Sequence, residues 1–256
     1  MLDDRAANEV IGFVLVFSLI TATVGVVSVV GFDGLEQSRD AERVDNAERA
    51  FDVLADNVAD IYYEDAPTRA TEIKLSDAEL LLASNPSPTE LNVNVNGTQV
   101  PLVSPRPLIY RSETDSDSRV VYEAGAVFRV DGDSAVMLRE PPMVLREGQS
   151  IVTLVTTQGD PGQAVGGTTT ALVRAEELES ETLYPSGGAG ASVSDNVTIS
   201  VQTTDARAPA WERYLESEVG WRDDACGLQG TNRVNCEFAT DGLYVNDVAI
   251  EFTLSG

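Results

Sequence analysis

The sequence predicts an α+β protein in which a long N-terminal helix is followed by an antiparallel, β-rich head, either a sandwich or a barrel. Three observations lead to this prediction. An uncharged apolar stretch fills residues 10–32, and a helical repeat of apolar residues continues to residue 64. After Pro67, period-two alternation and frequent turn signals dominate. A short helix near the C-terminal end completes the predicted fold.

The apolar stretch is long enough to cross a membrane. Residues 10–32 are 23 residues without a charge, and at about 1.5 Å per residue they span roughly 34 Å. A secretory signal has a basic start, a shorter apolar core and a small-residue cleavage site behind that core. This chain instead starts Met-Leu-Asp-Asp-Arg and has Phe-Asp-Gly behind the core. We therefore expect the chain to keep this helix.

The segment before the apolar stretch, residues 4–12, reads Asp-Arg-Ala-Ala-Asn-Glu-Val-Ile-Gly. It resembles the type III signal that opens haloarchaeal type IV pilins, although Asn8-Glu9 replaces the Ser-Pro pair of the common motif. In that family, prepilin peptidase removes a short charged leader before the apolar helix. The resemblance implies a single cut near the bond between Ala6 and Ala7. It also implies that Glu9 pairs with the terminal amine of a neighbouring subunit, since an unpaired charge in hydrocarbon is costly.

The helical pattern continues beyond the membrane segment. Apolar residues recur at alternating spacings of three and four, with charged residues on the other faces: Val44, Ala47, Phe51, Leu54, Val58 and Ile61. The helix is predicted to end near Glu64, because Pro67 disfavours helix in the residue before it. We expect Phe51, Leu54, Val58 and Ile61 to dock on the sheet of the head. A stalk coiled coil of an ordinary anchored protein has the same pattern.

The head, residues 67–256, reads as a series of short strands. Asn96-Gly97 predicts a hairpin turn between alternating strands. The predicted strands are residues 91–95, 99–103, 119–122, 126–130, 134–138, 151–157, 168–174 and 193–202, with a closing hairpin over 243–254 about Asn246-Asp247. Residues 113–118 and 185–190 are predicted loops.

A short helix is predicted over residues 209–216, because Pro209 is favoured in a first turn. It places Trp211, Tyr214 and Leu215 on one face, which is typical of packing on a sheet; a ligand platform is the alternative. This segment and residues 122–129 resemble parts of uncharacterised haloarchaeal pilin-like proteins.

The cysteines and two glycosylation motifs favour an oxidising, extracellular location for the head. Cys226 and Cys236 predict a local disulfide, and two unpaired buried thiols are the alternative. Asn96 and Asn196 each begin an Asn-X-Thr motif for N-glycosylation. Arginines behind the apolar stretch weakly favour the opposite orientation. The expected organisation is a leader over residues 1–6, a membrane and assembly helix over 7–66, and an extracellular head over 67–256.

Composition excludes several classes of function. The net charge is −25, so nucleic acid is not an expected partner. Lys74 is the sole lysine beside 16 arginines, which indicates a halophile or an ordinary acidic secreted protein. The chain has no histidine, which excludes Ser-His-Asp and Cys-His catalysis and a Cys/His zinc site. No pattern points to a cofactor, a metal or an enzyme.

The resemblance to haloarchaeal pilins, together with the predicted helix and head, implies a structural subunit of an archaeal surface filament, a minor pilin-like protein or pseudopilin. Its expected partners are the membrane, prepilin peptidase and other pilin subunits. The alternative is a monomeric, membrane-anchored cell-surface protein whose β-sandwich head binds a partner.

Overall fold

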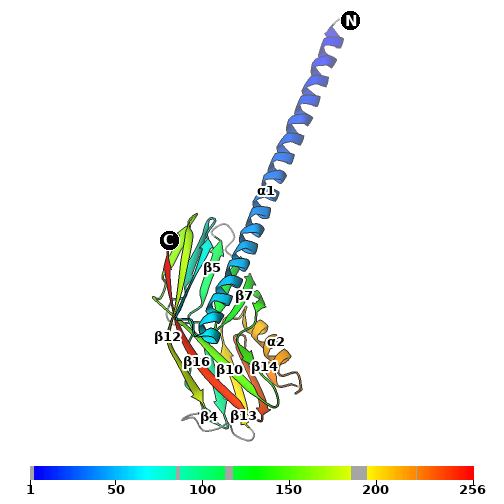
Figure 1. Cartoon of the computed structure of the whole chain (residues 1–256). Coiled ribbons are helices and arrows are strands. Elements are labelled where there is room, and N and C mark those ends of the chain that lie inside the picture. The colour runs from blue at the N-terminus through cyan, green and yellow to red at the C-terminus, as the bar shows by residue number, and fades with distance from the viewer. Residues whose placement is uncertain (1–2, 85–86, 113–117, 186–194, 223) are drawn as a thin grey trace. The chain divides into compact units, whose positions relative to one another are not determined.

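The structure is a computed structural model that describes residues 3–84, 87–112, 118–185, 195–222 and 224–256. It separates into two compact units, Met1–Arg43 and Val44–Gly256. The predicted loops at residues 113–118 and 185–190 lie almost entirely outside the described residues. The larger unit is mostly antiparallel β-structure with a helix packed on it, so the protein belongs to the α+β class (Figure 1).

Helix α1 (Asp3–Glu64) is continuous over 62 residues and ends at Glu64, as the sequence predicts. Asp65 takes a left-handed φ of 54°, and the N–H of Ala66 donates to the carbonyl of Asp60 at 3.3 Å. This reversal, with Pro67 just beyond it, ends the helix. The last part of α1, from Val44, belongs to the same compact unit as the sheets. That unit therefore starts before the head that was predicted to begin at residue 67.

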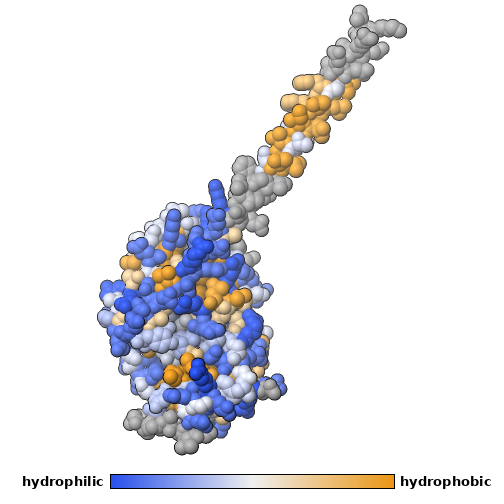
Figure 2. Space-filling view, turned by 45° about the vertical axis from the view of Figure 1, so that its right-hand side comes forward, coloured by the Kyte–Doolittle hydropathy of each residue, from blue (hydrophilic) through white to orange (hydrophobic). Residues whose placement is uncertain are grey.

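The first unit contains the apolar part of α1. Within the described residues, the segment Ile11–Ser28 is long and apolar enough to cross a membrane, with a mean hydropathy of 2.3 and none of it buried. Figure 2 shows it as a band of hydrophobic surface. The hydroxyls of Thr21 and Thr23 donate to the carbonyls of Phe17 and Leu19 at 2.8 and 3.0 Å, so they need no water. A membrane anchor and a signal sequence share these properties.

The described strands of the head form three sheets. The first sheet has the order β1 (Thr68–Lys74), β12 (Thr170–Tyr184), β16 (Leu243–Ser255), β10 (Ser150–Gln158) and β9 (Met143–Val144). The second has the order β11 (Ala164–Gly167), β2 (Ala78–Leu82), β5 (Leu108–Ser112), β6 (Ser118–Glu123), β7 (Ala126–Asp131) and β8 (Ser134–Arg139). The third has the order β14 (Cys226–Leu228), β15 (Arg233–Thr240), β13 (Asp195–Gln202), β3 (Glu90–Val95) and β4 (Thr98–Gln99).

The predicted closing hairpin about Asn246-Asp247 is wrong. Strand β16 runs unbroken for 13 residues between β12 and β10, and it is parallel to β10. The side chains of Asn246 and Asp247 instead accept hydrogen bonds from residues of the neighbouring strands. Thr182 Oγ1 donates to Asn246 Oδ1 at 3.0 Å, and Thr156 Oγ1 donates to Asp247 Oδ1 at 2.5 Å. These bonds let a polar pair lie inside a central strand.

The predicted return strand over residues 99–103 is shorter than expected. Residues 98–99 pair with β3 after the Asn96-Gly97 turn, and Val103 makes a single bridge to Leu91. Pro101 interrupts the ladder between them, because proline has no N–H to donate. The predicted meander over residues 119–138 is confirmed as β6, β7 and β8.

Two apolar cores hold the head together. The first lies between α1 and strands of the first two sheets, and it buries all six apolar positions of the helical repeat to 3% exposure or less: Val44, Ala47, Phe51, Leu54, Val58 and Ile61. The second joins the third sheet to β7, β10 and helix α2 (Ala208–Glu218). Trp211 of α2 is fully buried against Phe128, with ring centroids 5.8 Å apart. The aromatic face of α2 therefore packs on the sheet and is not a ligand platform.

Candidate functional site

The predicted processing and assembly residues lie in the first turns of α1. The backbone of Ala6, Ala7 and Glu9 is helical, while their side chains lie outside the described part of the structure. The cut near Ala6–Ala7 and the pairing of Glu9 stay predictions.

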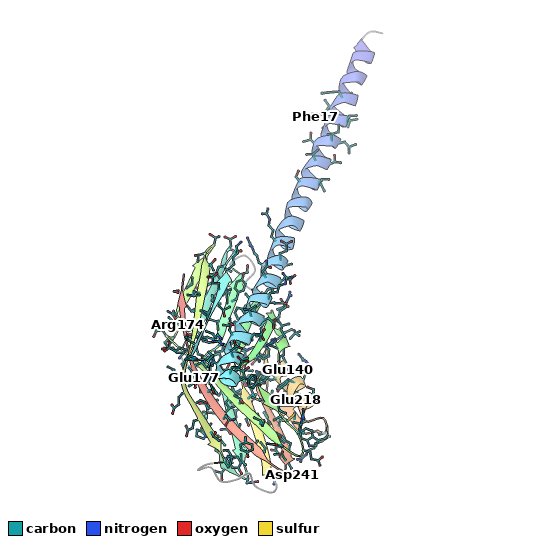
Figure 3. The ribbon with its side chains drawn as sticks, viewed as in Figure 1. Phe17, Glu140, Arg174, Glu177, Glu218 and Asp241 are labelled. Carbon is teal, nitrogen blue, oxygen red and sulfur yellow. A yellow bond between two sulfur atoms is a disulfide. The ribbon has the colours of Figure 1, made fainter. Side chains whose placement is uncertain are left out.

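The exposed apolar surface of α1 is the main candidate interaction surface of the first unit. Every residue from Ile11 to Ser28 is exposed, and Phe13 and Phe17 stack along the helix with ring centroids 6.1 Å apart. The side chain of Phe17 projects away from the ribbon (Figure 3). Such a continuous apolar surface is rare on a soluble monomer and marks a membrane or protein contact.

Three arginines from the sheets hold the last part of α1 from outside the apolar core. They bind an acidic row on the helix, defined as Asp45, Glu48, Asp52, Asp56 and Asp60. Arg129 of β7 reaches Glu48 at 2.9 Å, and Arg139 of β8 reaches Asp52 at 3.0 Å. Arg69 of β1 binds Asp60 at 2.9 Å. These side chains are 24% or more exposed, so the pairs orient the helix and contribute little stability.

A hydrogen bond fixes α1 against the edge of the first sheet. The side-chain amide of Asn57 donates to Thr71 Oγ1 of β1 at 2.8 Å. Strand β1 is an edge strand of that sheet, so this bond attaches the helix to the sheet at its edge strand. Together with the apolar core, this contact makes the last part of α1 an integral part of the head.

The two cysteines are cross-strand partners. Cys226 of β14 lies opposite Cys236 of β15, their Cα atoms are 4.0 Å apart, and a disulfide joins them. The bond therefore attaches the short edge strand β14 to the third sheet. The sequence predicted this pairing from spacing, but it did not show that both residues occupy one register position.

The two predicted glycosylation residues meet at one tip of the third sheet. The N–H of Asn96 donates to the carbonyl of Asn196, and the N–H of Asn196 donates to Oδ1 of Asn96, both at 2.9 Å. Both residues are exposed, at the β3–β4 turn and the start of β13. The predicted sites are thus immediate neighbours, although 100 positions separate them in the sequence.

Sequence reasoning missed a buried carboxylate in the centre of the head. Glu123 is fully buried and accepts hydrogen bonds from Thr89 Oγ1 at 2.7 Å, from Thr203 Oγ1 at 2.9 Å and from Trp211 Nε1 at 2.9 Å. Arg207 Nη2 lies 2.6 Å from Glu123 Oε2 as an ion pair that lacks hydrogen-bond alignment. The sequence does contain a pattern that indicates a buried carboxylate, because Glu123 is the one charged residue in the otherwise uncharged, mostly apolar residues 120–128.

This Glu123 network joins four parts of the chain that are distant in sequence. Glu123 ends β6, Thr89 precedes β3, Thr203 follows β13, and Trp211 lies on α2. A buried charge persists only where it is paired and hydrogen-bonded. The network therefore fixes the segment between β13 and α2 against the second sheet.

Tyr214 fixes helix α2 through a second hydrogen bond, one turn beyond Trp211. Its hydroxyl donates to the carbonyl of Met143 at 3.2 Å. Burial raises the pKa of Tyr214, and the carboxylates of Glu218 and Glu140 raise it further. Figure 3 labels both carboxylates beside α2. The hydroxyl thus stays a hydrogen-bond donor at neutral pH.

A family profile matches residues 5–253, so it covers the apolar helix and the head together. The chain belongs to the family of unknown function DUF7289. No curated protein and no solved structure gives a significant match to this DUF7289 member.

Among the described residues of this DUF7289 chain, no group of three or more cysteines, aspartates and glutamates is arranged to hold a metal ion. The buried carboxylate of Glu123 has hydroxyl, indole and guanidinium partners, which is the pattern of a structural network. Three features of the described residues are candidates for an interaction: the exposed apolar residues of α1, the tip that carries Asn96 and Asn196, and a pocket between the second sheet and the segment before α2.

Proposed function

We propose that this DUF7289 protein is a structural subunit of a type IV pilus-like archaeal surface filament, as a minor pilin-like protein or pseudopilin. Its apolar helix would pack against those of neighbouring subunits, and its β-rich head, as a sandwich or barrel, would face the cell exterior. Prepilin peptidase would remove the leader first. The near absence of lysine and the charge of −25 support a halophilic source.

One observation carries this proposal. Helix α1 is a single helix whose residues 11–28 expose every side chain, while its later apolar positions lie in the core of the head. A simple anchor does not need this continuity, because a flexible linker suffices to tether a head. If the helix is part of the head, the way in which neighbouring helices pack would also determine how the heads of those subunits are positioned. The family profile spans both parts, which supports their acting as one unit.

The first test is the mature N-terminus. Mass spectrometry of protein from the native host should find a start at Ala7 or an adjacent residue. An intact Met1, or a start beyond Asp33, would contradict the type III signal.

The second test is assembly. Arginine at Val16 or Leu19 costs about 2.5–3.5 kcal/mol in the middle of a membrane helix, so these variants should form no filaments by electron microscopy. Ala41→Arg is the matched control, because Ala41 is exposed and lies beyond the apolar stretch. The variants must also be found in the membrane fraction, which shows that the arginine blocks assembly and not membrane insertion. Filaments formed by a chain that begins at Asp33 would show that the head drives assembly.

A monomeric anchored surface protein with a binding head is the second candidate, and a pocket on the head favours it. This pocket, of about 710 Å³, opens between the second sheet and the segment before α2. Shearing the cells separates the two functions. A filament subunit is released with the filaments, whereas a monomeric anchor stays in washed membranes.

A further inference from the structure

The pocket lies on the face of the second sheet that also contributes Val121 and Val130 to the second apolar core. Its apolar floor is formed by side chains of three neighbouring strands, Ile109 of β5, Val121 of β6 and Val130 of β7. The segment between β13 and α2 forms a polar wall, with Gln202 and Thr204. A half-apolar concavity of this size between packed elements is a typical site for a small molecule.

Arg119 of β6 is a pocket residue with an unmet hydrogen-bond donor. Its Nε is buried and has no acceptor among the described residues. Within the described part of the chain, its Nη2 reaches only the carbonyl of Gly132, at a long 3.5 Å. A buried N–H without an acceptor leaves its desolvation uncompensated. A ligand oxygen in the pocket would supply the missing acceptor.

The remaining charges exclude a bare anion as the best ligand. The carboxylates of Asp133 and Asp205 line the same pocket, and the guanidinium of Arg207 is already neutralised by Glu123. An anion bound at Arg119 would therefore meet two acids. A hydroxyl-bearing ligand avoids this conflict, because each hydroxyl can accept from arginine and donate to a carboxylate.

The polar wall is held in place before any ligand binds. Thr203 donates to Glu123 at 2.9 Å, and Arg207 Nε donates to Thr203 Oγ1 at 3.1 Å. The side chain of Asp205 accepts from Thr231 Oγ1 at 3.1 Å. These contacts fix the backbone that carries Gln202 and Thr204, and a preformed site loses less entropy on binding.

We propose that this pocket binds a sugar unit of a glycan. Arg119 would donate to a ring or hydroxyl oxygen, Asp133 and Asp205 would accept from hydroxyls, and the apolar floor would contact the C–H face of the ring. The site goes beyond a filament role, and it serves equally a filament subunit or an anchored monomer.

The test uses full-length protein in a detergent without a sugar head group. Methyl glycosides of glucose, galactose, mannose and glucuronic acid are screened by saturation-transfer NMR, and binders are titrated by calorimetry. Arg119→Leu should weaken binding by about tenfold or more, the loss expected for a hydrogen bond to a charged donor. Arg111→Leu is the matched control. Arg111 lies directly opposite Arg119 on β5, but it pairs with Glu79 and does not line the pocket.

A second variant separates binding from folding. Asp133→Asn leaves an exposed turn residue nearly unchanged in shape. This variant should weaken the binding of the sugar more than it weakens the binding of a simple carboxylate such as acetate. Both variants must unfold at the temperature of the parent protein, and the readout does not depend on filaments. The proposal is overturned if no glycoside binds at tens of millimolar, if Arg119→Leu and Arg111→Leu bind equally, or if acetate displaces the sugar at equal concentration.

Discussion

The guanidinium of Arg207 lies 2.6 Å from the carboxylate of Glu123, and both side chains are buried at the junction of the second sheet and α2. Such a pair carries a high cost when one partner is removed, because the other is left as an unpaired charge in the interior. The threonine and tryptophan donors around Glu123 raise this cost.

Glu123→Gln should destabilise the protein by about 3–5 kcal/mol, because Arg207 loses its counter-charge. Arg207→Met should cost a similar amount. The double variant should cost clearly less than the sum of the two, since it removes both charges together. Denaturant unfolding of the full chain in detergent measures all three. Additive losses would contradict a direct coupling, and Arg213→Ala, an exposed change on the same helix, is the control.

Asp247 should make stability depend on pH in the acidic range. Burial raises the pKa of Asp247, and Glu179 and Glu181 raise it further, while a hydrogen bond from Thr156 opposes them. The folded state therefore holds the proton more tightly, and stability falls as pH rises from the ordinary value of 3.8 through the raised pKa. Asp247→Asn should raise the melting temperature near neutral pH, and the gain should shrink below that ordinary value. A gain that is equal at all pH values would contradict this explanation.

The apolar contacts of α1 should stabilise the head far more than its ion pairs do. Phe51→Ala should cost about 3–5 kcal/mol, because Phe51 is fully buried in the first core. Arg139→Gln should cost less than about 1 kcal/mol, because its pairs with Asp52 and Asp56 are exposed to solvent. Urea unfolding at low and high salt separates the effects. High salt should abolish the arginine effect and leave the phenylalanine effect.

The two glycosylation motifs should compete. Asn96 and Asn196 are joined at one tip by a backbone hydrogen bond and by a second bond from the N–H of Asn196 to Oδ1 of Asn96, so a glycan on one crowds the other. Thr98→Ala removes the first motif but keeps Asn96, and it should raise occupancy at Asn196; Thr198→Ala should do the reverse. Glycopeptide mapping of protein from the native host measures both. Full occupancy of both residues on one molecule would contradict the prediction.

Local sequence determined the elements whose signals lie within a few residues. The three-and-four spacing of apolar residues gave the buried face of α1, and Pro67 marked its end at Glu64. Turn residues at 124–125 and 132–133 marked the meander of β6, β7 and β8, and Pro209 with its aromatic neighbours marked α2. These features depend on period, turn chemistry and proline, all of which act between near neighbours in the chain.

Only the tertiary structure decided how distant segments meet. Asn246-Asp247 has the sequence of a turn. The hydroxyls of Thr156 and Thr182, on the flanking strands, donate hydrogen bonds to these two side chains, so β16 continues as a central strand. Glu123 resembles a surface acid, but Trp211, 88 positions away, helps to bury it. The contact of Asn96 with Asn196 likewise spans 100 positions. No local pattern encodes such partners, because the packing of the sheets determines which side chains share one low-dielectric site.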